Sequence, residues 1–316
     1  MSKTDLSQGT IIHAHEHIDP VFLNTPQFEL EALNRALGIR TVLKVETLNP
    51  IRSFKGRGTD YFVQNSSQES TFVCASAGNF GQGMAYACRK NQISLVVFAA
   101  TTANPLKIEQ MRRLGADIHL AGADFDGAKD AGKAYAAENG GVFVEDGKVA
   151  EVSIGAGTIG LELSQYPDPI DTLLIPLGNG ALINGVGTWF KASFPKTKVI
   201  GVVAENAPSM QLSWCRDLVV TTETAETISD GIAVRHPVPE ALQIMKTTVD
   251  DIVQVSDEAT IKAMRLVYNF AGIVIEPAGA VGLAAAMMFK KRLLGQIIAT
   301  PLCGSNMTVE QIAGWL

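Results

Sequence analysis

The feature that most constrains the fold is a regular alternation of short apolar runs and longer helix-forming runs in the middle of the chain. The apolar runs, each as long as a buried strand, are Thr71 to Ala75, Ile93 to Ala100, Asp117 to Ala121 and Val142 to Glu145. The runs predicted as helices between them are Gln82 to Lys90, Pro105 to Leu114 and Asp126 to Glu138. Strands that alternate with helices of about ten residues predict a parallel, doubly wound sheet whose ligands bind at the carboxyl ends of the strands.

The same alternation continues on both sides of this region. Before it, Phe28 to Leu37 is predicted as a helix that stops at Gly38, and Thr41 to Val45 as a strand. After it, we expect strands at Thr172 to Leu177, Val199 to Ala204 and Gln296 to Ala299, and helices starting at Ile183, Glu258 and Ala278. At 316 residues the chain is long enough for two domains. The fold class we expect is therefore α/β, with two doubly wound units and mainly parallel sheets.

Composition argues against several kinds of partner. The net charge is −6 and no cluster of Lys and Arg stands out, so nucleic acid is not an expected partner. Apolar runs such as Leu173 to Leu177 are too short to cross a membrane, and the polar start, Met1 to Gln8, lacks the apolar core of a secretory signal. The 4 cysteines show no CxxC spacing. We expect reduced thiols in a cytoplasmic protein.

One lysine stands where a helix is expected to begin. The stretch Asn49 to Gly58 (NPIRSFKGRG) follows the strand Thr41 to Val45 and places Lys55 between an aromatic residue and a glycine. Crowding by Arg52, by Arg57 and by a helix N-terminus would favour the neutral amine, which is a nucleophile and a base. The alternative is a basic loop on the solvated surface.

Two glycine-rich loops are placed to hold anions. Gly178 to Leu182 (GNGAL) lies directly between an apolar strand and a predicted helix, so its backbone N–H groups and the helix dipole would suit one phosphate. Ser76 to Gly81 (SAGNFG) occupies the same kind of position. Its small residues would leave N–H groups and the side chains of Ser76 and Asn79 free for a carboxylate. In either place, a tight turn without a ligand is the alternative.

A third glycine pattern fails on its context. Gly155 to Gly160 (GAGTIG) matches the dinucleotide-binding fingerprint. However, Val149 to Ile154 is a poor strand, and the acids Asp168 and Asp171 precede the next strand instead of ending it. Nicotinamide binding is therefore a minor alternative.

Histidines gather near the N-terminus. His13, His15 and His17 would share one face of a strand, which is a metal-ligand pattern in some hydrolases. The other histidines, His119 and His236, fall in no ligand pattern, so we expect an exposed segment instead of a metal site.

A nucleophilic lysine, a phosphate loop and a carboxylate loop together suggest pyridoxal 5'-phosphate and an amino acid. Lysine forms a Schiff base with this cofactor, the loop holds its phosphate, and its ring accepts electrons from the substrate.

At this point the chain resembles the threonine and serine dehydratases (threonine ammonia-lyases) of the fold type II pyridoxal-phosphate enzymes, which are related to serine racemase. The resemblance runs from about Thr25 to the C-terminus. It rests on Ser53-Phe54-Lys55 with Arg57-Gly58, Ser76-Ala77-Gly78-Asn79, Gly178 to Leu182, Ser229-Asp230-Gly231-Ile232, Glu276-Pro277-Ala278-Gly279-Ala280 and Cys303-Gly304-Ser305-Asn306.

The resemblance implies a role for each of these motifs. Lys55 would carry the cofactor and act as the base at Cα, while Asn79 would bond the ring hydroxyl and Cys303 would face the pyridine nitrogen. The implied cofactor-binding residues are Phe54, Lys55, Asn79, Gly178, Asn179, Gly180, Ala181, Leu182, Gly231, Glu276 and Cys303. The implied substrate-binding residues are Ser76, Ala77, Gly78, Asn79 and Phe80.

The chain departs from the dehydratase pattern around the cofactor. Phe80 replaces the usual His, Asn179 stands in a phosphate loop that is usually all glycine, and Ile51-Arg52 replaces the usual Thr-Gly. Ala77 matches the serine that acts as the second base of serine racemase, so we expect poor racemisation.

The family's divalent-metal site and its regulatory domain are not expected here. One metal-binding acid matches Glu205, but the second falls on Gln211, so we predict no metal. The longer biosynthetic enzymes carry a C-terminal regulatory domain, for which we expect no room after Leu316.

The resulting prediction is a cytoplasmic, homodimeric lyase with its active site between two domains. Residues 67–150 would form a small domain inserted in a large cofactor-binding domain made of residues 1–66 and 151–316. The expected reaction is β-elimination from L-threonine or L-serine to a 2-oxo acid and ammonia. Alternatives are a hydroxyaspartate or diaminopropionate lyase, a threonine synthase-like or β-replacing synthase, and a catalytically silent homologue. A substrate with a second carboxylate would need another cation, for which Arg52 and Arg235 are candidates.

Overall fold

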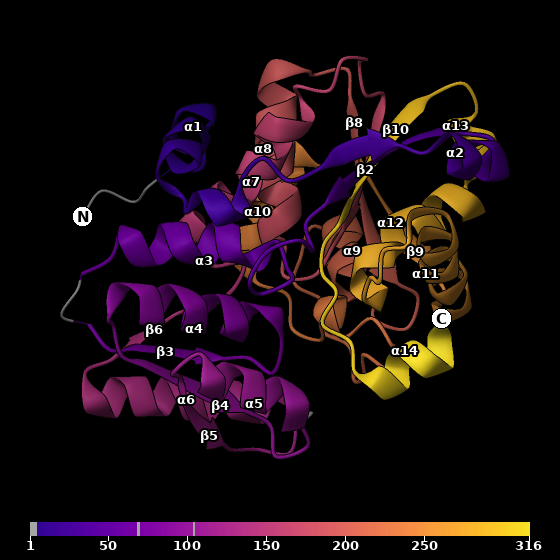
Figure 1. Ribbon diagram of the computed structural model, residues 1–316. Coiled ribbons are helices and arrows are strands. Elements are labelled where there is room, and N and C mark those ends of the chain that lie inside the picture. The colour runs from indigo at the N-terminus through magenta and orange to yellow at the C-terminus, as the bar shows by residue number, and fades with distance from the viewer. Residues whose placement is uncertain (1–4, 68–69, 104) are drawn as a thin grey trace.

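The computed structural model describes residues 5–67, 70–103 and 105–316, so the first part of the polar start lies outside the described residues. Two sheets organise the chain, a six-stranded sheet in the order β1-β2-β10-β7-β8-β9 and a four-stranded sheet in the order β5-β4-β3-β6. Figure 1 shows the smaller sheet and its helices at the lower left, and the larger sheet with the orange and yellow helices on the other side. The fold is thus α/β with mainly parallel sheets, as predicted.

The smaller sheet is built from consecutive strand and helix units. Its strands are β3 (Phe72–Ala75), β4 (Leu95–Ala99), β5 (Asp117–Leu120) and β6 (Val142–Phe143), all paired in parallel. The helices between them are α4 (Asn79–Asn91), α5 (Pro105–Arg113) and α6 (Phe125–Asn139). Successive residues of β3 face opposite cores, Cys74 toward the cluster with α4 and Val73 toward the cluster with α6. Because both of their faces are covered, β3 and β4 are continuously apolar instead of alternating, whereas the edge strand β5 contains Asp117 and His119 and is partly exposed.

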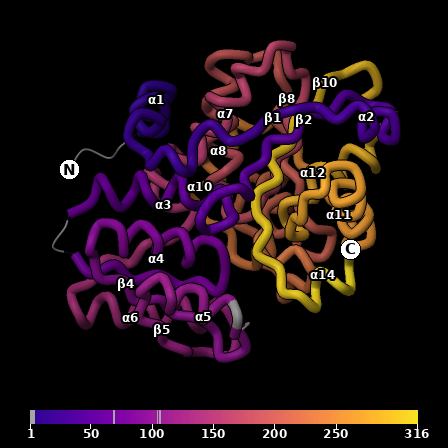
Figure 2. Tube along the Cα trace, in the orientation of Figure 1, coloured from indigo at the N-terminus to yellow at the C-terminus, as the bar shows by residue number. Residues whose placement is uncertain are grey.

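The larger sheet collects strands from both ends of the chain. They are β1 (Gln27–Glu29), β2 (Arg40–Val45), β7 (Thr172–Pro176), β8 (Lys198–Ala204), β9 (Asp251–Val255) and β10 (Ile297–Leu302). The short β1 pairs antiparallel with β2, and the other neighbours are parallel. The pairing of β2 with β10 joins the N-terminal part of the chain to its C-terminal part, and the tube in Figure 2 shows these indigo and yellow segments side by side.

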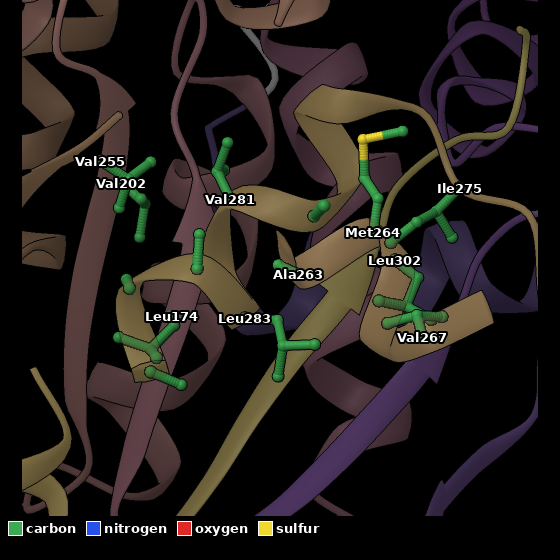
Figure 3. Close-up of a cluster of buried hydrophobic side chains, with 14 of the residues drawn as sticks. Leu174, Val202, Val255, Ala263, Met264, Val267, Ile275, Val281, Leu283 and Leu302 are labelled. Atoms are coloured by element: carbon green, nitrogen blue, oxygen red, sulfur yellow. The ribbon is translucent and has the colours of Figure 1, made fainter. Parts of the chain in front are cut away.

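Helices cover both faces of the larger sheet. One face carries α11 (Asp257–Ala271) and α12 (Pro277–Met288), whose apolar residues form with Leu174, Val202 and Leu302 the buried cluster drawn in Figure 3. The other face carries α7 (Ala150–Leu163), α8 (Ala181–Ser193) and α10 (Pro239–Thr248). The remaining helices are α1 (Gln8–His17), α2 (Glu31–Leu37), α3 (Lys55–Gln64), α9 (Ser209–Arg216), α13 (Lys290–Leu293) and α14 (Val309–Trp315), with 3-10 turns at Pro20–Phe22 and Asp230–Ile232.

Helix α3 lies between the two sheets and packs on both α4 and α7. The glycines of the GAGTIG sequence lie inside α7, not in a turn between a strand and a helix. A Cβ atom at Gly155 would come within 2.6 Å of the Arg57 carbonyl oxygen in α3, and one at Gly157 within 3.1 Å of the Gly185 carbonyl oxygen in α8. These glycines therefore let α7 approach α3 and α8 closely. Because they lie within a helix, the sequence GAGTIG is not a dinucleotide-binding loop, as expected.

Two local predictions are wrong. The histidine segment is the helix α1, not a strand, because Ser7 caps its start and Ile11 and Ala14 are buried at helical spacing. The predicted helix Phe28 to Leu37 begins only at Glu31, since Gln27–Glu29 pairs with β2 as an edge strand. Gly38 does end that helix, in the left-handed conformation with φ of 70°.

All strands of the smaller sheet lie between residues 72 and 143, inside the predicted small domain. The boundaries at residues 67 and 150 stay a proposal. Within the described ranges, no helix is long and apolar enough to cross a membrane.

Candidate active site

A cavity of about 440 Å³ lies where the carboxyl ends of strands from both sheets meet. The loop after β3, the loop after β7, the start of α3, the start of α12 and the residues after β10 all line it. This is the edge at which parallel sheets bind ligands. The cavity brings together every predicted site residue, namely Phe54, Lys55, Ser76, Ala77, Gly78, Asn79, Phe80, Gly178, Asn179, Gly180, Ala181, Leu182, Gly231, Glu276 and Cys303. Their individual roles stay predictions.

Lys55 is the first residue of α3, and its side chain reaches into the cavity. The preceding residue is anchored to the end of β10, because the Phe54 backbone N–H donates to the Cys303 carbonyl oxygen at 3.0 Å. The Nζ atom lies 4.8 Å from the centroid of the Phe54 ring and donates to Oδ2 of Asp146 at 2.6 Å. The amine is thus held by an aromatic ring and one carboxylate.

Lys55 does begin a helix, as predicted, but the expected crowding by Arg52 and Arg57 is not found. Arg52 is exposed, so its charge is solvated. Arg57 is fully buried, but its guanidinium donates to Glu46 at 2.8 Å and to Glu162 at 2.6 Å. Sequence alone could not show this, because Glu162 is 105 residues away from Arg57 and no motif links Glu46 to it.

The buried charges around Arg57 form a balanced network. Lys44 donates to Glu162 at 2.5 Å, so two cations face the two acids Glu46 and Glu162. Although burial alone would raise it, the charges of Arg57 and Lys44 lower the pKa of Glu162 to about 2. The network ties α3 to α7 and to β2, which fixes the helix that begins with Lys55.

The loop Ser76 to Phe80 opens α4 but differs in detail from the expectation. The Ser76 hydroxyl is not free, since it accepts hydrogen bonds from the N–H groups of Gly78 (3.2 Å) and Gly81 (2.9 Å). Gly81 belongs to the first turn of α4, so the Ser76 side chain already satisfies one N–H group of that turn. The N–H groups of Asn79 and Phe80 are left for a carboxylate.

The Asn79 side chain joins a small polar network at the cavity wall. Its amide donates to Glu276 at 2.5 Å, and its oxygen accepts from the Asn306 amide at 2.8 Å. Burial and the nearby charge of Asp230 raise the pKa of Glu276 to about 7, against the opposing charge of Lys107. Asn79 retains a second amide hydrogen, so the implied contact with the cofactor's ring hydroxyl is still possible.

Cys303 presents a neutral group to the cavity. Burial, with the charges of Glu276 and Glu46, raises the pKa of the Cys303 thiol well above its usual value. A protonated thiol here fits the implied neighbour of an unprotonated pyridine nitrogen.

The loop Gly178 to Leu182 fits a phosphate. It leads into the 13-residue helix α8, whose start has no side-chain cap among the described residues, and Gly180 has φ of 93°. A Cβ atom at Gly178 would lie 3.0 Å from the Gly231 carbonyl oxygen, so the two glycines keep this side of the cavity narrow. Open N–H groups at a helix N-terminus, a nearby lysine amine and a neutral thiol are together the groups that pyridoxal phosphate requires.

Paired charges surround the cavity. Lys107 pairs with Asp230, Arg235 with Asp124 (3.3 Å) and Asp126 (2.9 Å), and Lys129 with Glu145. Of these residues, the sequence indicates Arg235 as a candidate cation and Asp230 as part of a motif. Sequence reasoning missed the others, which no local signal marks, namely Lys107, Asp124, Asp126, Lys129 and Glu145.

The described residues contain no group of three or more His, Cys, Asp or Glu that could hold a metal. In α1, His13 stacks on His17 with centroids 3.9 Å apart, whereas His15 faces Glu162 at 3.6 Å. Gln211 donates to the Ile252 carbonyl oxygen at 2.6 Å and accepts from Gln254, so its amide holds β9.

Comparison with known proteins agrees with this geometry. A family model described as "Pyridoxal-phosphate dependent enzyme" matches residues 18–304. The chain is 36% identical over 283 residues to the L-threonine ammonia-lyase of Thermotoga maritima, covering 89% of this chain and 70% of that protein. It is 33% identical over 303 residues to the biosynthetic L-threonine dehydratase of Halalkalibacterium halodurans, covering 94% and 73%. Among solved structures, the processed threonine deaminase isoform 2 of Solanum lycopersicum superposes with a TM-score of 0.89 at 30% identity, covering 98% of this chain and 88% of that one.

Proposed function

This chain belongs to the family of pyridoxal-phosphate dependent enzymes, and from that premise we propose that it is an ammonia-lyase that eliminates water from L-threonine or L-serine. The products are a 2-oxo acid and ammonia. The observation that carries the proposal is the cavity itself, which is lined by Lys55 and by the N-termini of α4 and α8. One helix start suits a substrate carboxylate and the other a cofactor phosphate.

Each loop has a separate task in this proposal. The N–H groups from Gly178 to Leu182 bind the cofactor's phosphate, and Gly231 packs closely against Gly178 on the same side of the cavity. The N–H groups at the start of α4, in Ser76 to Phe80, bind the substrate carboxylate. With the cofactor's phosphate held at one loop and the substrate's carboxylate at the other, the Cα–H bond of the substrate is oriented toward Nζ of Lys55.

Lys55 performs the proton transfer. Its Nζ atom takes the Cα proton as a general base, and the bond to the β-hydroxyl then breaks. The bound pyridoxal phosphate supplies an electron sink for the electron pair left on Cα. Phe54 packs against the lysine, and the neutral Cys303 adds no charge beside the ring.

The cavity's ion pairs favour a substrate without a second carboxylate. Arg235, the candidate partner for such a group, is already paired with Asp124 and Asp126. Lys107 and Lys129, the other cations of the described lining besides Lys55, are likewise paired with acids. A 3-hydroxyaspartate would have to break one of these pairs, so we rank it below threonine and serine.

We also propose that the protein is a cytoplasmic homodimer. Free cysteines at Cys74, Cys88, Cys215 and Cys303 support a reducing compartment. The dimer rests on the resemblance to the dehydratases alone.

The test is release of 2-oxo acid by purified, cofactor-loaded protein from L-threonine, L-serine and threo-3-hydroxyaspartate. We expect release from threonine or serine, with hydroxyaspartate slower. A loaded protein that releases nothing from any of them contradicts the elimination reaction and favours a synthase or a silent homologue. Release from hydroxyaspartate alone contradicts the substrate class.

A further inference from the structure

The residue in contact with the Lys55 amine is an acid that no motif marked. Asp146 lies in the turn between β6 and α7, and its Oδ2 atom accepts from Nζ of Lys55 at 2.6 Å. The next residue, Gly147, has φ of 85°, and a Cβ atom there would lie 2.2 Å from the Asn179 carbonyl oxygen. The turn therefore packs on the phosphate loop and brings its acid to the lysine.

The contact is sheltered from solvent. The side chain of Lys55 is 13% exposed and that of Asp146 is 15% exposed. The second oxygen of Asp146, Oδ1, is buried and accepts no hydrogen bond from the part of the chain that the structure describes. Opposite charges attract more strongly here than in water, because few solvent molecules screen them.

The other charges of this turn are directed elsewhere. Glu145 pairs with Lys129 and with Lys133 (3.6 Å), and Lys148 lies 3.6 Å from Glu240. Asp146 thus differs from its neighbours, since its partner is the amine to which we assign the chemistry.

Resting on the proposed function, we propose that Asp146 is a positioning residue that holds Lys55 whenever its Nζ atom is protonated. In the elimination, the Cα–H bond breaks, the proton forms a third N–H bond on Nζ, and the electron pair stays with the substrate and its cofactor. The ammonium so formed lies beside the Asp146 carboxylate, which stabilises the charge as it develops. In the cofactor-free protein the amine donates to the same carboxylate.

The first experiment measures the amine without any cofactor. Cofactor-free protein is treated at pH 8 with formaldehyde and cyanoborohydride, and methylation of Lys55 is followed by peptide mass spectrometry. Only a neutral amine reacts, and loss of an adjacent opposite charge leaves more of it neutral. We expect Asp146→Asn to be labelled about tenfold faster than wild type, whereas the control Glu145→Gln, which removes the adjacent acid, changes the rate little.

The second experiment measures the proton transfer in the loaded enzyme. With substrate deuterated at Cα, Asp146→Asn should show a larger isotope effect on kcat than wild type, because breaking the Cα–H bond becomes slower. We expect kcat to fall about 10- to 100-fold with KM nearly unchanged. Asp146→Glu, which keeps a carboxylate in the turn, should recover part of kcat and the slow labelling. A purely structural role would not change the isotope effect.

Labelling of Lys55 at the wild-type rate in Asp146→Asn would overturn the proposal, as would an unchanged isotope effect in an active variant. Failure of the proposed function is distinguishable, since wild type would then release no 2-oxo acid while the labelling difference still reports on the contact. Equal acceleration by Glu145→Gln would also contradict the proposal, because any acid of the turn would then serve.

Discussion

Two cations stand two residues apart at the start of α3, and they lie in opposite surroundings. Arg57 is fully buried and donates to Glu46, Glu162, Thr25 and Thr158. Lys55 projects into the cavity, where one carboxylate and the rings of Phe54 and Phe80 lie near its amine. The first is a fixed part of the scaffold and the second is free to exchange its partner.

The difference shows how a helix start can serve structure and chemistry together. Arg57 has a planar group with five N–H donors, which can bond two acids at once and cannot be deprotonated. The lysine has a single nitrogen that can lose a proton and become a nucleophile. Anchoring at Arg57 therefore positions Lys55 without restricting its end.

Of the changes considered, removal of the Lys55 side chain should have the largest effect on turnover. Lys55→Ala should lower release of 2-oxo acid by at least about 10³-fold, because base and attachment point are lost together. The fold should remain, since the side chain lies at the cavity wall and its ion pair there is with Asp146. Circular dichroism and a melting curve check the fold. Retained turnover in this variant would end the assignment of Lys55.

Removal of the Arg57 guanidinium should instead lower the stability of the fold. Arg57→Leu leaves Glu46 and Glu162 buried with only Lys44 as counter-ion, so we expect a loss of about 3–5 kcal/mol in the free energy of unfolding. Urea unfolding of the cofactor-free protein measures it. The matched control is Arg35→Leu, which removes the exposed Arg35–Glu31 pair and should cost at most about 1 kcal/mol. Equal losses in both variants would contradict a special role for the buried network.

The buried network around Arg57 and the cavity around Lys55 also differ in the pKa values of their acids. Glu162 beside Arg57 has a pKa of about 2, whereas Glu276 in the cavity wall has a pKa of about 7. Since the folded state raises the pKa of Glu276 above 4.5, its contribution to stability is complete below pH 4.5 and is lost as the pH rises through 7. The cofactor-free protein should lose up to about 3 kcal/mol over this window relative to Glu276→Gln.

The test is to measure the free energy of unfolding of wild type and of Glu276→Gln from pH 4.5 to pH 8 and to compare how each changes with pH. Parallel curves for the two proteins would mean that the fold does not raise the pKa of Glu276.

The smallest expected change asks whether Lys55 acts alone as a base. Ala77 lines the cavity at the position that matches the second base of serine racemase. Ala77→Ser should raise racemisation of serine relative to elimination by a few fold, within about 1 kcal/mol of activation free energy. Chiral chromatography of the recovered serine measures the ratio. If the ratio is unchanged, the missing hydroxyl is not what prevents racemisation.

Much of the fold could be predicted because its strands are buried on both faces. Leu95–Ala99 is apolar throughout, and so is β8 after the exposed Lys198; both strands are flanked by helices, so the pattern identifies them. The strand β9 and the helix α7 were missed. Asp251 and Gln254 interrupt the apolar pattern of β9, and the glycines of α7 are typical of loops unless close helix packing is known.

The site was predicted through its glycine loops and its lysine, which are local signals. Its charges were not, because each depends on a partner distant in sequence, such as Lys55 with Asp146 or Lys107 with Asp230. The expected crowding of Lys55 by Arg57 was wrong for the same reason. A basic residue's effect on its neighbour is decided by the acids that the fold brings to it.

The central claim is that Lys55 carries the cofactor. Loaded protein should be reduced with borohydride, which fixes a Schiff base permanently, then digested and mapped by mass spectrometry. The account predicts the cofactor on the peptide that contains Lys55, and none on peptides with Lys107 or Lys129, the other lysines of the described cavity lining. Cofactor fixed to another lysine, with Lys55 unmodified, would contradict it.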